Sequence, residues 1–403
     1  MARGIFKTVA ALLAVSAVSI SMAQAGGFSR GTADTDILYE EGNFNIRAGA
    51  TIVSPTRKYT ANGNPALVGT DYTTTYVIPS AAIKLNISDD LRCAGTFSQP
   101  YGGSTTFAAP TTSGKLSENF VINEFGATCG YKVGLSKGQF WVLGGLFQEG
   151  FDYQRVNFTP AGNANLGLTG KDVGFRLGAA YEIPEIALRA QLMYRSATSY
   201  GATGTLAVPT AAILGQQAQV AALAGNLLLA QTLQLQAQAA AAAGLVTTLP
   251  ATGTGELPQS VELKLQSGIA PGWLAFGSVK WTDWSVTKQL IVSSPIGIQT
   301  NDYFWKDGWT VTAGIGHAFN DQISGAASLT WDQGVKTGWD LSSDTWTLGL
   351  GGSYKDSMGG EFRGGVGITY IAGATETLNA LGTNAAVGSG MAYAASASYK
   401  VKW

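Results

Sequence analysis

The sequence is poor in charge and in the side chains that perform most catalysis. Only 13% of the 403 residues are charged, and the 25 Lys and Arg nearly balance the 26 Asp and Glu. No block of one sign therefore predicts a nucleic-acid partner. One histidine and two cysteines exclude most metal sites and most nucleophile chemistry, so we expect neither a cofactor nor an enzymatic activity. The 53 glycines and the 10% of aromatic residues are instead typical of a β-rich protein with many turns.

The first 25 residues have the pattern of a secretory signal peptide. Arg3 and Lys7 give a basic start, Val9 to Ile20 form an apolar stretch, and residues 23–25 (Ala-Gln-Ala) are a small-residue cleavage site. The alternative, an anchoring transmembrane helix, needs about 20 apolar residues, and this stretch is shorter. We therefore expect residues 1–25 to be removed and the rest of the chain to fold outside the cytoplasm.

Segments throughout the rest of the chain alternate apolar and polar residues with a period of two. Residues 186–195 and 261–266 show it most clearly, with Leu263 between Glu262 and Lys264. Such alternation predicts strands with one apolar and one polar face. Outside one insertion, no further segment has the length and apolar continuity of a spanning helix. A bilayer is therefore crossed only by a closed β-barrel.

The connections between these strands alternate between short turns and long loops. Six short turns, the first near Asn86 to Asp90, alternate with seven long loops, which include residues 155–169 and 199–257. This predicts fourteen strands with both chain ends on the periplasmic side. A soluble β-sandwich is the alternative, but its outward residues would be polar, whereas here the apolar face continues from strand to strand. We expect an all-β fold, a 14-stranded antiparallel transmembrane β-barrel.

The last predicted strand, Ala392 to Trp403, ends in an aromatic residue. This ending resembles the assembly signal of bacterial outer-membrane barrels. We therefore expect a location in the bacterial outer membrane, with membrane lipid around the barrel. We also expect the barrel assembly machinery to recognise Trp403, and the finished barrel to be a monomer.

Several short motifs occur in an order and spacing that resemble the FadL-type family of outer-membrane transporters for long-chain fatty acids and hydrocarbons. The motifs are Pro100-Tyr101-Gly102, Leu257-Pro258-Gln259-Ser260, Trp281-Thr282-Asp283-Trp284-Ser285, Trp305-Lys306-Asp307-Gly308-Trp309 and Trp331-Asp332. The resemblance implies a fourteen-stranded barrel over residues 44–403 and passive uptake of a hydrophobic substrate. It also implies that an outer groove between the loops captures the substrate, which leaves sideways into the membrane at a kinked strand.

The same resemblance implies that residues 26–43 form a short plug, or hatch, inside the barrel. Gly31-Thr32-Ala33-Asp34 is similar to the small-residue stretch of the family's hatch. The Asn-Pro-Ala that usually follows is absent from this segment, where Tyr39-Glu40-Glu41-Gly42 stands instead. We therefore expect a shorter hatch than is usual in the family.

The fourth long loop, residues 199–257, contains an uncharged insertion. The stretch from Ala211 to Ala243 is almost wholly Ala, Leu and Gln, which are good helix formers, so we expect one or two helices here. A structural cap over the barrel mouth and an apolar groove that captures substrate both fit this composition, whereas frequent Gln disfavours a transmembrane span. The residues expected to line such a groove are Val220, Leu223, Leu227 and Leu228.

If the apolar faces contact lipid, a set of cations points into the barrel. A fixed Arg or Lys lowers the cost of taking a carboxylate out of water, so some of these cations are candidates to guide a fatty-acid headgroup. The alternative is that they pair with luminal acids or with the hatch and only hold the barrel together. The candidates are Arg176, Arg189, Arg195, Lys264 and Arg363.

The third predicted strand has two further features. Pro100, Gly102 and Gly103 near its outer end are candidates for the lateral opening, because Pro removes a donor from the ladder and Gly weakens strand pairing. Cys93 lies near its periplasmic start, and Cys129 lies near the periplasmic end of the fourth strand. In an oxidising compartment we expect these two cysteines to form a structural disulfide.

These patterns favour a channel for passive uptake of hydrophobic compounds, above all long-chain fatty acids. The alternatives are a general porin for small polar solutes, an outer-membrane hydrolase, and a structural or adhesive barrel. A porin needs an open, strongly polar lumen, which neither the hatch nor the uncharged insertion serves. A hydrolase needs an activating base, and the only histidine, His317, lies on an apolar face. Nothing in the sequence excludes the adhesive barrel.

Overall fold

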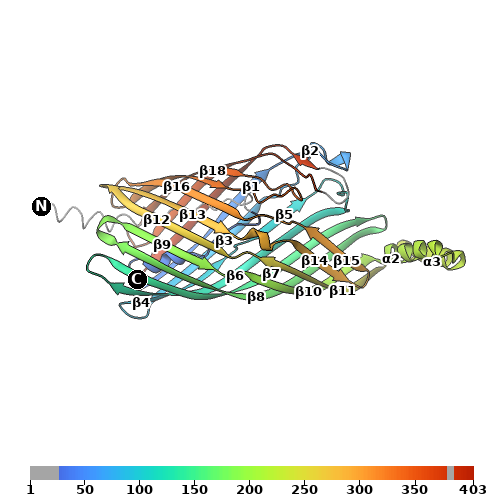
Figure 1. The fold of residues 1–403 in the computed structure, drawn as a ribbon, viewed down its shortest axis with the longest axis horizontal. Helices are drawn as coiled ribbons and strands as arrows, with labels where there is room; N and C mark the ends of the chain where they lie inside the picture. The colour runs from blue at the N-terminus through green and yellow to red at the C-terminus, as the bar shows by residue number, and fades with distance from the viewer. Residues whose placement is uncertain (1–26, 379–384) are drawn as a thin grey trace.

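The chain folds into one long closed β-sheet with a pair of helices at one end (Figure 1). The computed structural model describes residues 27–378 and 385–403, and the predicted signal peptide, residues 1–25, lies outside them. In chain order the segments of the sheet are β1 (Phe44–Thr56), β3 (Tyr76–Asn86), β4 (Leu91–Ser98), β5 (Gly102–Thr106), β6 (Lys115–Gly134), β7 (Gln139–Thr159), β8 (Gly162–Ile183), β9 (Leu188–Arg195), β10 (Thr198–Pro209), β11 (Val246–Leu257), β12 (Ser260–Ala270), β13 (Trp273–Thr282), β14 (Gln289–Ser294), β15 (Gly297–Asp302), β16 (Gly308–Ala318), β17 (Ile323–Asp332), β18 (Thr345–Lys355), β19 (Glu361–Ile371) and β22 (Gly390–Lys402).

These segments make a closed antiparallel barrel of fourteen strands, which confirms the predicted fold. Five strands are each interrupted once, as β4/β5, β9/β10, β11/β12, β13/β14 and β15/β16. The barrel closes because β1 pairs with β3 on one side and with β22, the last strand, on the other. Short turns join consecutive strands at the end where the first and last strands begin and finish, as between Asn86 and Leu91.

The remaining elements are small. A three-stranded sheet lies apart from the barrel sheet. The part of the chain that the structure describes also contains four short 3-10 helices and two α-helices, and all but η1, which lies in the segment before β1, occur between strands. They are β2 (Tyr59–Ala61), β20 (Ala374–Thr375), β21 (Ala386–Val387), η1 (Thr35–Tyr39), η2 (Pro65–Leu67), η3 (Pro184–Ile186), η4 (Trp284–Val286), α2 (Thr210–Leu223) and α3 (Leu227–Ala242). None of the described helices is both long and apolar enough to cross a membrane.

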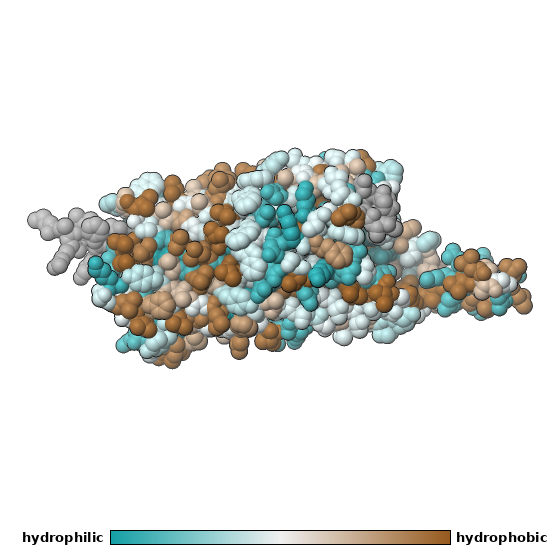
Figure 2. Space-filling model, in the orientation of Figure 1, coloured by the Kyte–Doolittle hydropathy of each residue, from teal (hydrophilic) through white to brown (hydrophobic). Residues whose placement is uncertain are grey.

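The two faces of the strands separate as the alternation predicts. Leu192 and Leu263, on neighbouring strands, are 49% and 39% exposed on the outer wall, whereas Gln191 and Arg195 point inward and are buried. Figure 2 shows apolar side chains spread over the barrel wall on the face in view. Because an outer wall of large apolar side chains is stable only against acyl chains, the wall is the surface that contacts lipid.

The barrel wall is much taller on one side than the sequence predicts. Residues 155–169, expected to be a long loop, instead continue β7 and β8, which pair out to Thr159 and Gly162 and join through a tight turn. The strands β10 and β11 extend in the same direction and carry α2 and α3 beyond the barrel (Figure 1). The alternation persists there because these residues enclose a second, apolar interior, described below.

A disulfide joins two adjacent strands in the lower part of the wall. Cys93 of β4 lies directly opposite Cys129 of β6, and their Sγ atoms are 2.08 Å apart. The bond lies on the outer face, since the neighbouring residues Ala94 and Thr128 are the ones that are buried inside. It fixes β4 to β6 below the point where the third strand is interrupted.

Candidate functional site

The third strand is broken between β4 and β5, and the hatch pairs with the break. The amide of Gly102 donates to the carbonyl of Phe28 (2.9 Å), the amide of Arg30 donates to Pro100 (2.8 Å), and the amide of Gly31 donates to Gln99 (2.8 Å). The segment from Phe28 to Gly31 therefore pairs with the broken strand through an isolated antiparallel bridge between Ser29 and Tyr101. This satisfies backbone groups that the broken ladder leaves unpaired.

The same place is a gap in the wall. β3 pairs with β4 only as far as Ala81, and among the described residues no strand pairs with that edge of β3 from Tyr76 to Ser80. The next contact is an isolated bridge between Thr73, which precedes β3, and Thr105. β5 pairs with β6 on its other side. Gly31 fits the gap because it has no side chain: a Cβ there would lie 3.0 Å from Ile78. The hatch thus closes an opening that the barrel strands leave.

The three residues predicted to kink the third strand all lie at this gap. Pro100 accepts the hydrogen bond from the hatch, and Gly102 packs against the Arg30 guanidinium, where a Cβ would lie 2.7 Å from the Cζ atom. Gly103 lies beside the ring of Phe120, which a Cβ would approach to 2.8 Å. Small residues here allow the hatch and the wall to approach each other closely.

The rest of the hatch is held inside the barrel by ion pairs. Glu40 is buried and forms ion pairs with Lys400 (2.7 Å), Arg363 (3.3 Å) and Arg47. Burial would raise the pKa of Glu40, but the three cations outweigh it and hold the pKa below its ordinary value. Asp34 adds a 2.6 Å pair to Arg47. The charged form of Glu40 is therefore part of what keeps the hatch docked.

We expect the Glu40→Gln variant to release the hatch. Three cations would lose their shared carboxylate, so amide hydrogen exchange in residues 27–43 should accelerate about tenfold or more. In the native chain, the pKa of Glu40 is lower in the docked hatch than in the free one. Docking is thus strongest above the ordinary pKa of about 4.3 and weakens as the pH falls below it. Glu41→Gln is the matched control, since Glu41 is exposed and lies 3.7 Å from Lys402; equal exchange in both variants would contradict this role.

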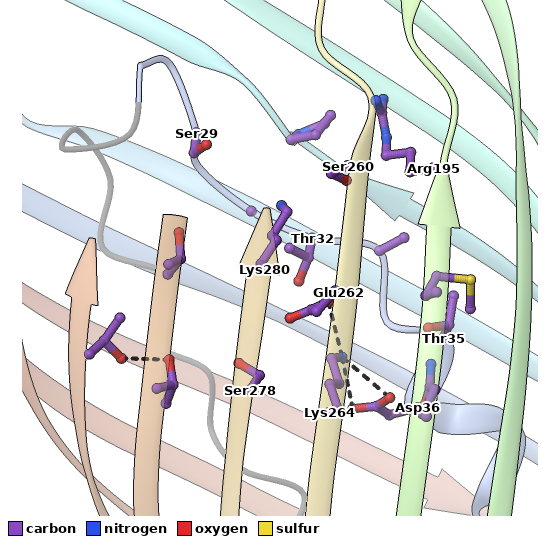
Figure 3. A pocket seen from close by; sticks show the side chains of 18 of the residues that line it. Ser29, Thr32, Thr35, Asp36, Arg195, Ser260, Glu262, Lys264, Ser278 and Lys280 are labelled. Atoms are coloured by element: carbon purple, nitrogen blue, oxygen red, sulfur yellow. Dashed lines mark hydrogen bonds and ion pairs between the residues drawn. The ribbon is translucent and has the colours of Figure 1, made fainter. Parts of the chain in front are cut away.

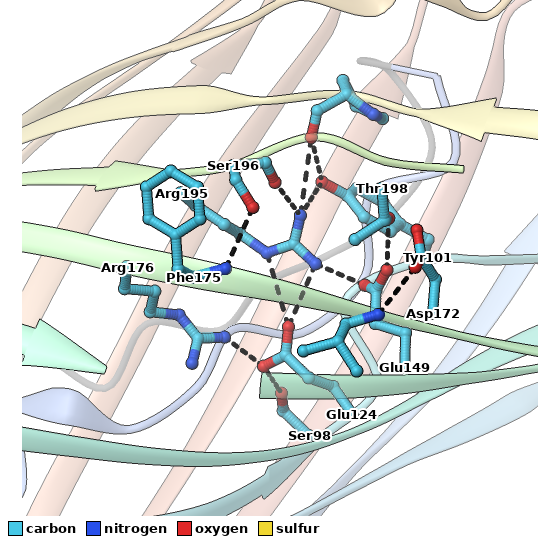
Figure 4. A network of polar contacts seen from close by, with 12 residues as sticks. Ser98, Tyr101, Glu124, Glu149, Asp172, Phe175, Arg176, Arg195, Ser196 and Thr198 are labelled. Atoms are coloured by element: carbon cyan, nitrogen blue, oxygen red, sulfur yellow. Dashed lines mark hydrogen bonds and ion pairs between the residues drawn. The ribbon is translucent and has the colours of Figure 1, made fainter. Parts of the chain in front are cut away.

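A buried charge network lies at the level of the gap (Figure 4). Arg195 pairs with Glu124 (3.0 Å) and with Glu149, and Arg176 pairs with the other oxygen of Glu124. The hydroxyl of Thr198 donates to Glu149 at 2.5 Å. Two cations thus face two carboxylates in a place almost without water access, where every charge needs its partner.

The network also ties together the interruptions of three strands. The Arg195 guanidinium donates to the carbonyl of Ser196 (3.3 Å), between β9 and β10, and to the carbonyl of Pro258 (3.4 Å), between β11 and β12. It also donates to the Tyr101 hydroxyl (3.3 Å), between β4 and β5. The two carbonyl groups lie where the strands are interrupted and have lost their partners in the ladder. Arg195 hydrogen-bonds to them and so links the interrupted strands from inside the barrel.

On the extracellular side of this network the interior is filled by apolar side chains, which we call the aromatic cluster. Phe28 of the hatch packs here, with its ring centroid 4.5 Å from that of Phe120, 5.3 Å from Tyr303 and 4.6 Å from Trp305. The buried members are Tyr101, Phe120, Ile122, Phe151, Tyr153, Leu166, Leu168, Ala202, Ala251, Leu257, Trp284, Leu290, Val292, Trp305 and Val335. This apolar interior lies inside the extended strands.

Hydrogen bonds close the cluster toward the outside. Asn301 of β15 donates to Glu118 of β6 at 2.8 Å and to Tyr153 of β7 at 3.3 Å. Arg155 of β7 donates to Gln299 of β15. Since β15 does not pair with β6 or β7 in the sheet, these contacts cross the mouth from one side to the other. A substrate that enters the cluster from outside must separate them.

On the other side of the charge network lies a polar cavity of about 240 Å³ (Figure 3). The hatch forms part of its wall, through residues such as Ser29, Thr32 and Asp36, and β12 and β13 contribute Lys264 and Lys280. Hydroxyl groups of β16, β17 and β18 line much of the rest. The cavity therefore combines hydrogen-bonding groups with cations at the level of the hatch.

Two cations that line this cavity have no ion pair among the described residues. Lys280 forms neither an ion pair nor a hydrogen bond there, and Figure 3 shows it among the side chains that line the cavity. The Arg30 guanidinium, in a residue only 6% exposed, lies 4.1 Å from the ring centroid of Tyr76, and its Nε and Nη2 atoms lack hydrogen-bond partners. Burial lowers the pKa of Arg30 from its ordinary value, and the Tyr76 hydroxyl opposes this. An anion that enters the cavity would give both cations an ion-pair partner.

The five cations singled out from the sequence are in a different situation, since each already pairs with a carboxylate. Arg176 and Arg195 belong to the charge network, and Arg363 pairs with Glu40 and with Glu361 (2.6 Å). Lys264 lies 3.4 Å from Asp36 of the hatch, and Arg189 lies 3.8 Å from Glu182. A substrate headgroup would have to displace these partners.

The apolar residues of the insertion lie far from the barrel mouth. Val220, Leu223, Leu227 and Leu228 surround the turn between α2 and α3, at the far end of the projecting hairpin (Figure 1). They are 61% to 90% exposed, so they do not form the expected groove with the barrel. The strands β10 and β11 hold the helices out, which the sequence alone does not indicate.

The sequence does not single out Arg30 or Phe28. Lys280 belongs to the set of cations that the alternation predicts to point inward, because it lies between the outward Val279 and Trp281, but nothing in the sequence distinguishes a paired from an unpaired lysine. Phe28 and Arg30 lie in a segment too short for a periodic pattern. Their role follows only from the long-range pairing of the hatch with the broken strand.

The sequence matches one protein-family model. It is described as Outer membrane protein transport protein (OMPP1/FadL/TodX) and matches residues 38–401. A search of the curated proteins found no match.

Solved structures of outer-membrane transporters share the fold. A Pseudomonas aeruginosa FadL homologue superimposes with a TM-score of 0.71 at 14% identity, with 94% of this chain and 98% of that chain covered. The Pseudomonas putida toluene transporter TodX gives a TM-score of 0.61 at 14% identity, covering 96% and 97%. The Ralstonia pickettii toluene transporter TbuX gives a TM-score of 0.61 at 12% identity, also covering 96% and 97%.

Proposed function

Because the chain belongs to the OMPP1/FadL/TodX family, whose members transport hydrophobic compounds across the outer membrane, we propose that it takes up long-chain fatty acids by passive diffusion. The observation that carries this proposal is that the aromatic cluster and the polar cavity both adjoin the same gap in the wall. An apolar cluster suits an acyl chain, and a polar cavity with two unpaired cations suits a carboxylate. The hatch separates both from the lipid.

The headgroup is proposed to bind at Arg30 and Lys280 rather than at the five cations that are already paired. A carboxylate at these two groups gains charge-assisted hydrogen bonds without breaking an existing ion pair. Arg30 also lies at the gap itself, against Gly102. The headgroup would therefore wait beside the opening, with the acyl chain directed into the aromatic cluster.

Lateral release is the second part of the proposal. The hatch segment from Phe28 to Gly31 must leave the gap for the substrate to pass. Outside the wall, just below the gap, an apolar groove of about 610 Å³ is lined by residues that include Ile83, Gly95 and Phe97. An acyl chain that emerges there meets an apolar surface at once, so it never crosses water. Release into the membrane needs no chemical step and no cofactor.

We expect the Lys280→Gln variant to lose uptake of a fatty acid selectively. A hydrogen bond to a charged group contributes about 1.5–3 kcal/mol, so removal of the ammonium should lower carboxylate uptake about tenfold or more. Uptake of an alkane of the same chain length should stay within about twofold. Lys336→Gln, which removes an exposed lysine from the loop between β17 and β18, is the control. Equal loss for acid and alkane would contradict the headgroup site.

Monoaromatic hydrocarbons are a second candidate substrate. The ring contacts of the aromatic cluster, such as the 5.2 Å separation of Trp284 and Trp305, favour flat aromatic ligands. Two of the similar solved structures are described as toluene transporters. Competition between toluene and a labelled fatty acid for uptake would decide between them, because toluene gains nothing from Arg30 or Lys280.

The single chain closes its own barrel, and we propose that it works as a monomer. Trp403, proposed to be recognised by the barrel assembly machinery, lies where β1 meets β22. Its carbonyl accepts hydrogen bonds from the amides of Asn43 (3.0 Å) and Phe44 (3.2 Å).

His317, the only histidine, packs against Trp273 (4.3 Å between ring centroids) on the outer wall, which supports a transporter rather than a hydrolase.

A further inference from the structure

The helical hairpin of α2 and α3 has its small residues inside and its large apolar residues outside. The residues buried where the two helices pack are alanines, including Ala218, Ala221 and Ala240, all less than 9% exposed. Leu223 and Leu228 are 90% and 77% exposed. A helix pair that is stable in water places leucines at its interface. The reverse arrangement, with small residues between helices and leucines outside, is typical of helices that lie among lipid chains.

The leucines surround the helices instead of forming one stripe. Leu227, Leu228 and Leu229 are consecutive, so they point in three directions about 100° apart, and they are 66%, 77% and 46% exposed. A single protein partner would cover one side of a helix. Leucines exposed on several sides of the helices instead fit lipid acyl chains, which can surround a helix on all sides.

The hairpin carries no charge, so no ion has to lose its hydration when the hairpin enters a lipid layer. Residues 200–255 contain no Asp, Glu, Lys or Arg. The exposed polar side chains of α3 are mostly glutamines, such as Gln231, Gln234 and Gln236. An uncharged segment enters the acyl region of a lipid layer without having to bury an ion.

Its position leaves the far end unobstructed by the barrel. The base of the hairpin contacts β10 and the turn between β7 and β8 at Ala161. From there the helices project away from the barrel, at the end opposite the C-terminus (Figure 1), and Figure 2 shows apolar residues at the far end. Helices of 14 and 16 residues are about 21 and 24 Å long, too short to span a bilayer but long enough to enter one leaflet.

We propose that the tip of this hairpin, formed by Val220, Leu223, Leu227 and Leu228, docks into the acyl layer of a phospholipid surface outside the cell. Such contact holds the mouth of the barrel at a phase in which hydrophobic compounds are concentrated. The inference goes beyond the transport function and does not depend on which compound is carried. Its test measures contact with vesicles and not uptake, so its failure is distinct from the failure of the proposed function.

The first experiment uses a fluorescent reporter at the tip. The native cysteines form a disulfide, so Leu228→Cys is labelled selectively with a polarity-sensitive dye in the full-length barrel embedded in a nanodisc. Addition of phosphatidylcholine vesicles should shift the emission to the blue, and brominated lipid should quench it. A dye at Ser113→Cys, in the exposed loop before β6, should respond to neither. An unchanged signal at Leu228, or equal changes at both sites, would overturn the proposal.

The second experiment removes the apolar tip without removing the helices. The triple variant Leu223→Gln, Leu227→Gln, Leu228→Gln keeps residues of good helix propensity and should reduce co-flotation of the nanodisc-embedded barrel with vesicles at least tenfold. The control variant Gln231→Ala, Gln234→Ala, Gln236→Ala changes exposed polar residues of α3 and should float as the native chain does. Equal flotation of all three proteins would overturn the proposal. So would self-association without vesicles that disappears in the triple variant, since the occupant would then be a second copy of the chain.

Discussion

A covalent link between the hatch and the wall at the gap is expected to abolish uptake. In the double variant Gly31→Cys, Ile78→Cys the new side chains face each other, since a Cβ at residue 31 would lie 3.0 Å from the Cγ2 atom of Ile78. This proximity is compatible with the Cβ separation of about 3.5–4.5 Å in disulfides. Because the proposed exit route requires the hatch to leave the gap, the oxidised variant should lose at least tenfold in fatty-acid uptake, and a reductant should restore it.

Controls separate a locked gate from a damaged barrel. The two single cysteine variants show the effect of each substitution alone. A second double variant, Ser324→Cys, Ser353→Cys, places a disulfide between β17 and β18, where the two hydroxyls are 2.7 Å apart and no gap exists. It should transport normally under oxidising conditions. The native chain with reductant gives the baseline for loss of the disulfide at Cys93. Normal uptake by the oxidised hatch variant would show that the substrate takes another route.

Removal of one cation from the buried charge network is expected to destabilise the barrel strongly. Arg195→Met leaves Glu149 without a cation and Glu124 with only Arg176, in a buried interior. Loss of one partner of a buried ion pair costs about 3–5 kcal/mol, and here the guanidinium also binds the bent strands through their carbonyl groups. The free energy of unfolding in urea, measured for the barrel in lipid vesicles, should fall by about this amount.

Two comparisons test whether the loss comes from unpaired buried charge. Lys402→Met breaks an exposed pair with Glu41 at 3.7 Å and should change the unfolding free energy by less than about 1 kcal/mol. The double variant Arg195→Met, Glu149→Gln also removes the carboxylate that only Arg195 pairs with and leaves Glu124 paired with Arg176, so it should recover part of the lost stability. If Arg195→Met unfolds like the native chain, the network has no such role.

The barrel itself is predictable from the sequence because its strands repeat one physical rule. A polypeptide in lipid must pair every backbone group and expose only apolar side chains, so each strand carries the same alternation. Leu263 between Glu262 and Lys264 shows the rule at a single position, and the inward Lys264 and outward Leu263 follow from it directly. The number of strands then follows from the number of turns.

The features that matter for transport are less predictable because they depend on contacts between distant segments. Residues 155–169 form strands rather than a loop, since they enclose the aromatic cluster together with β11 and β14, far along the chain. The hatch closes the gap through Phe28 to Gly31, four residues with no pattern of their own. Whether a luminal cation is paired depends on acids from other strands, as the contrast between Arg195 and Lys280 shows.

The most direct test of the central claim, uptake of a hydrophobic substrate, compares transport in cells that lack their own fatty-acid transporter, with and without this gene. Labelled long-chain fatty acid and a labelled sugar are supplied separately under the same conditions. The account predicts a several-fold gain in fatty-acid uptake and no gain for the sugar, because the hatch and the aromatic cluster obstruct the passage through the barrel. A gain for the sugar without a gain for the fatty acid would contradict it and identify the barrel as a porin.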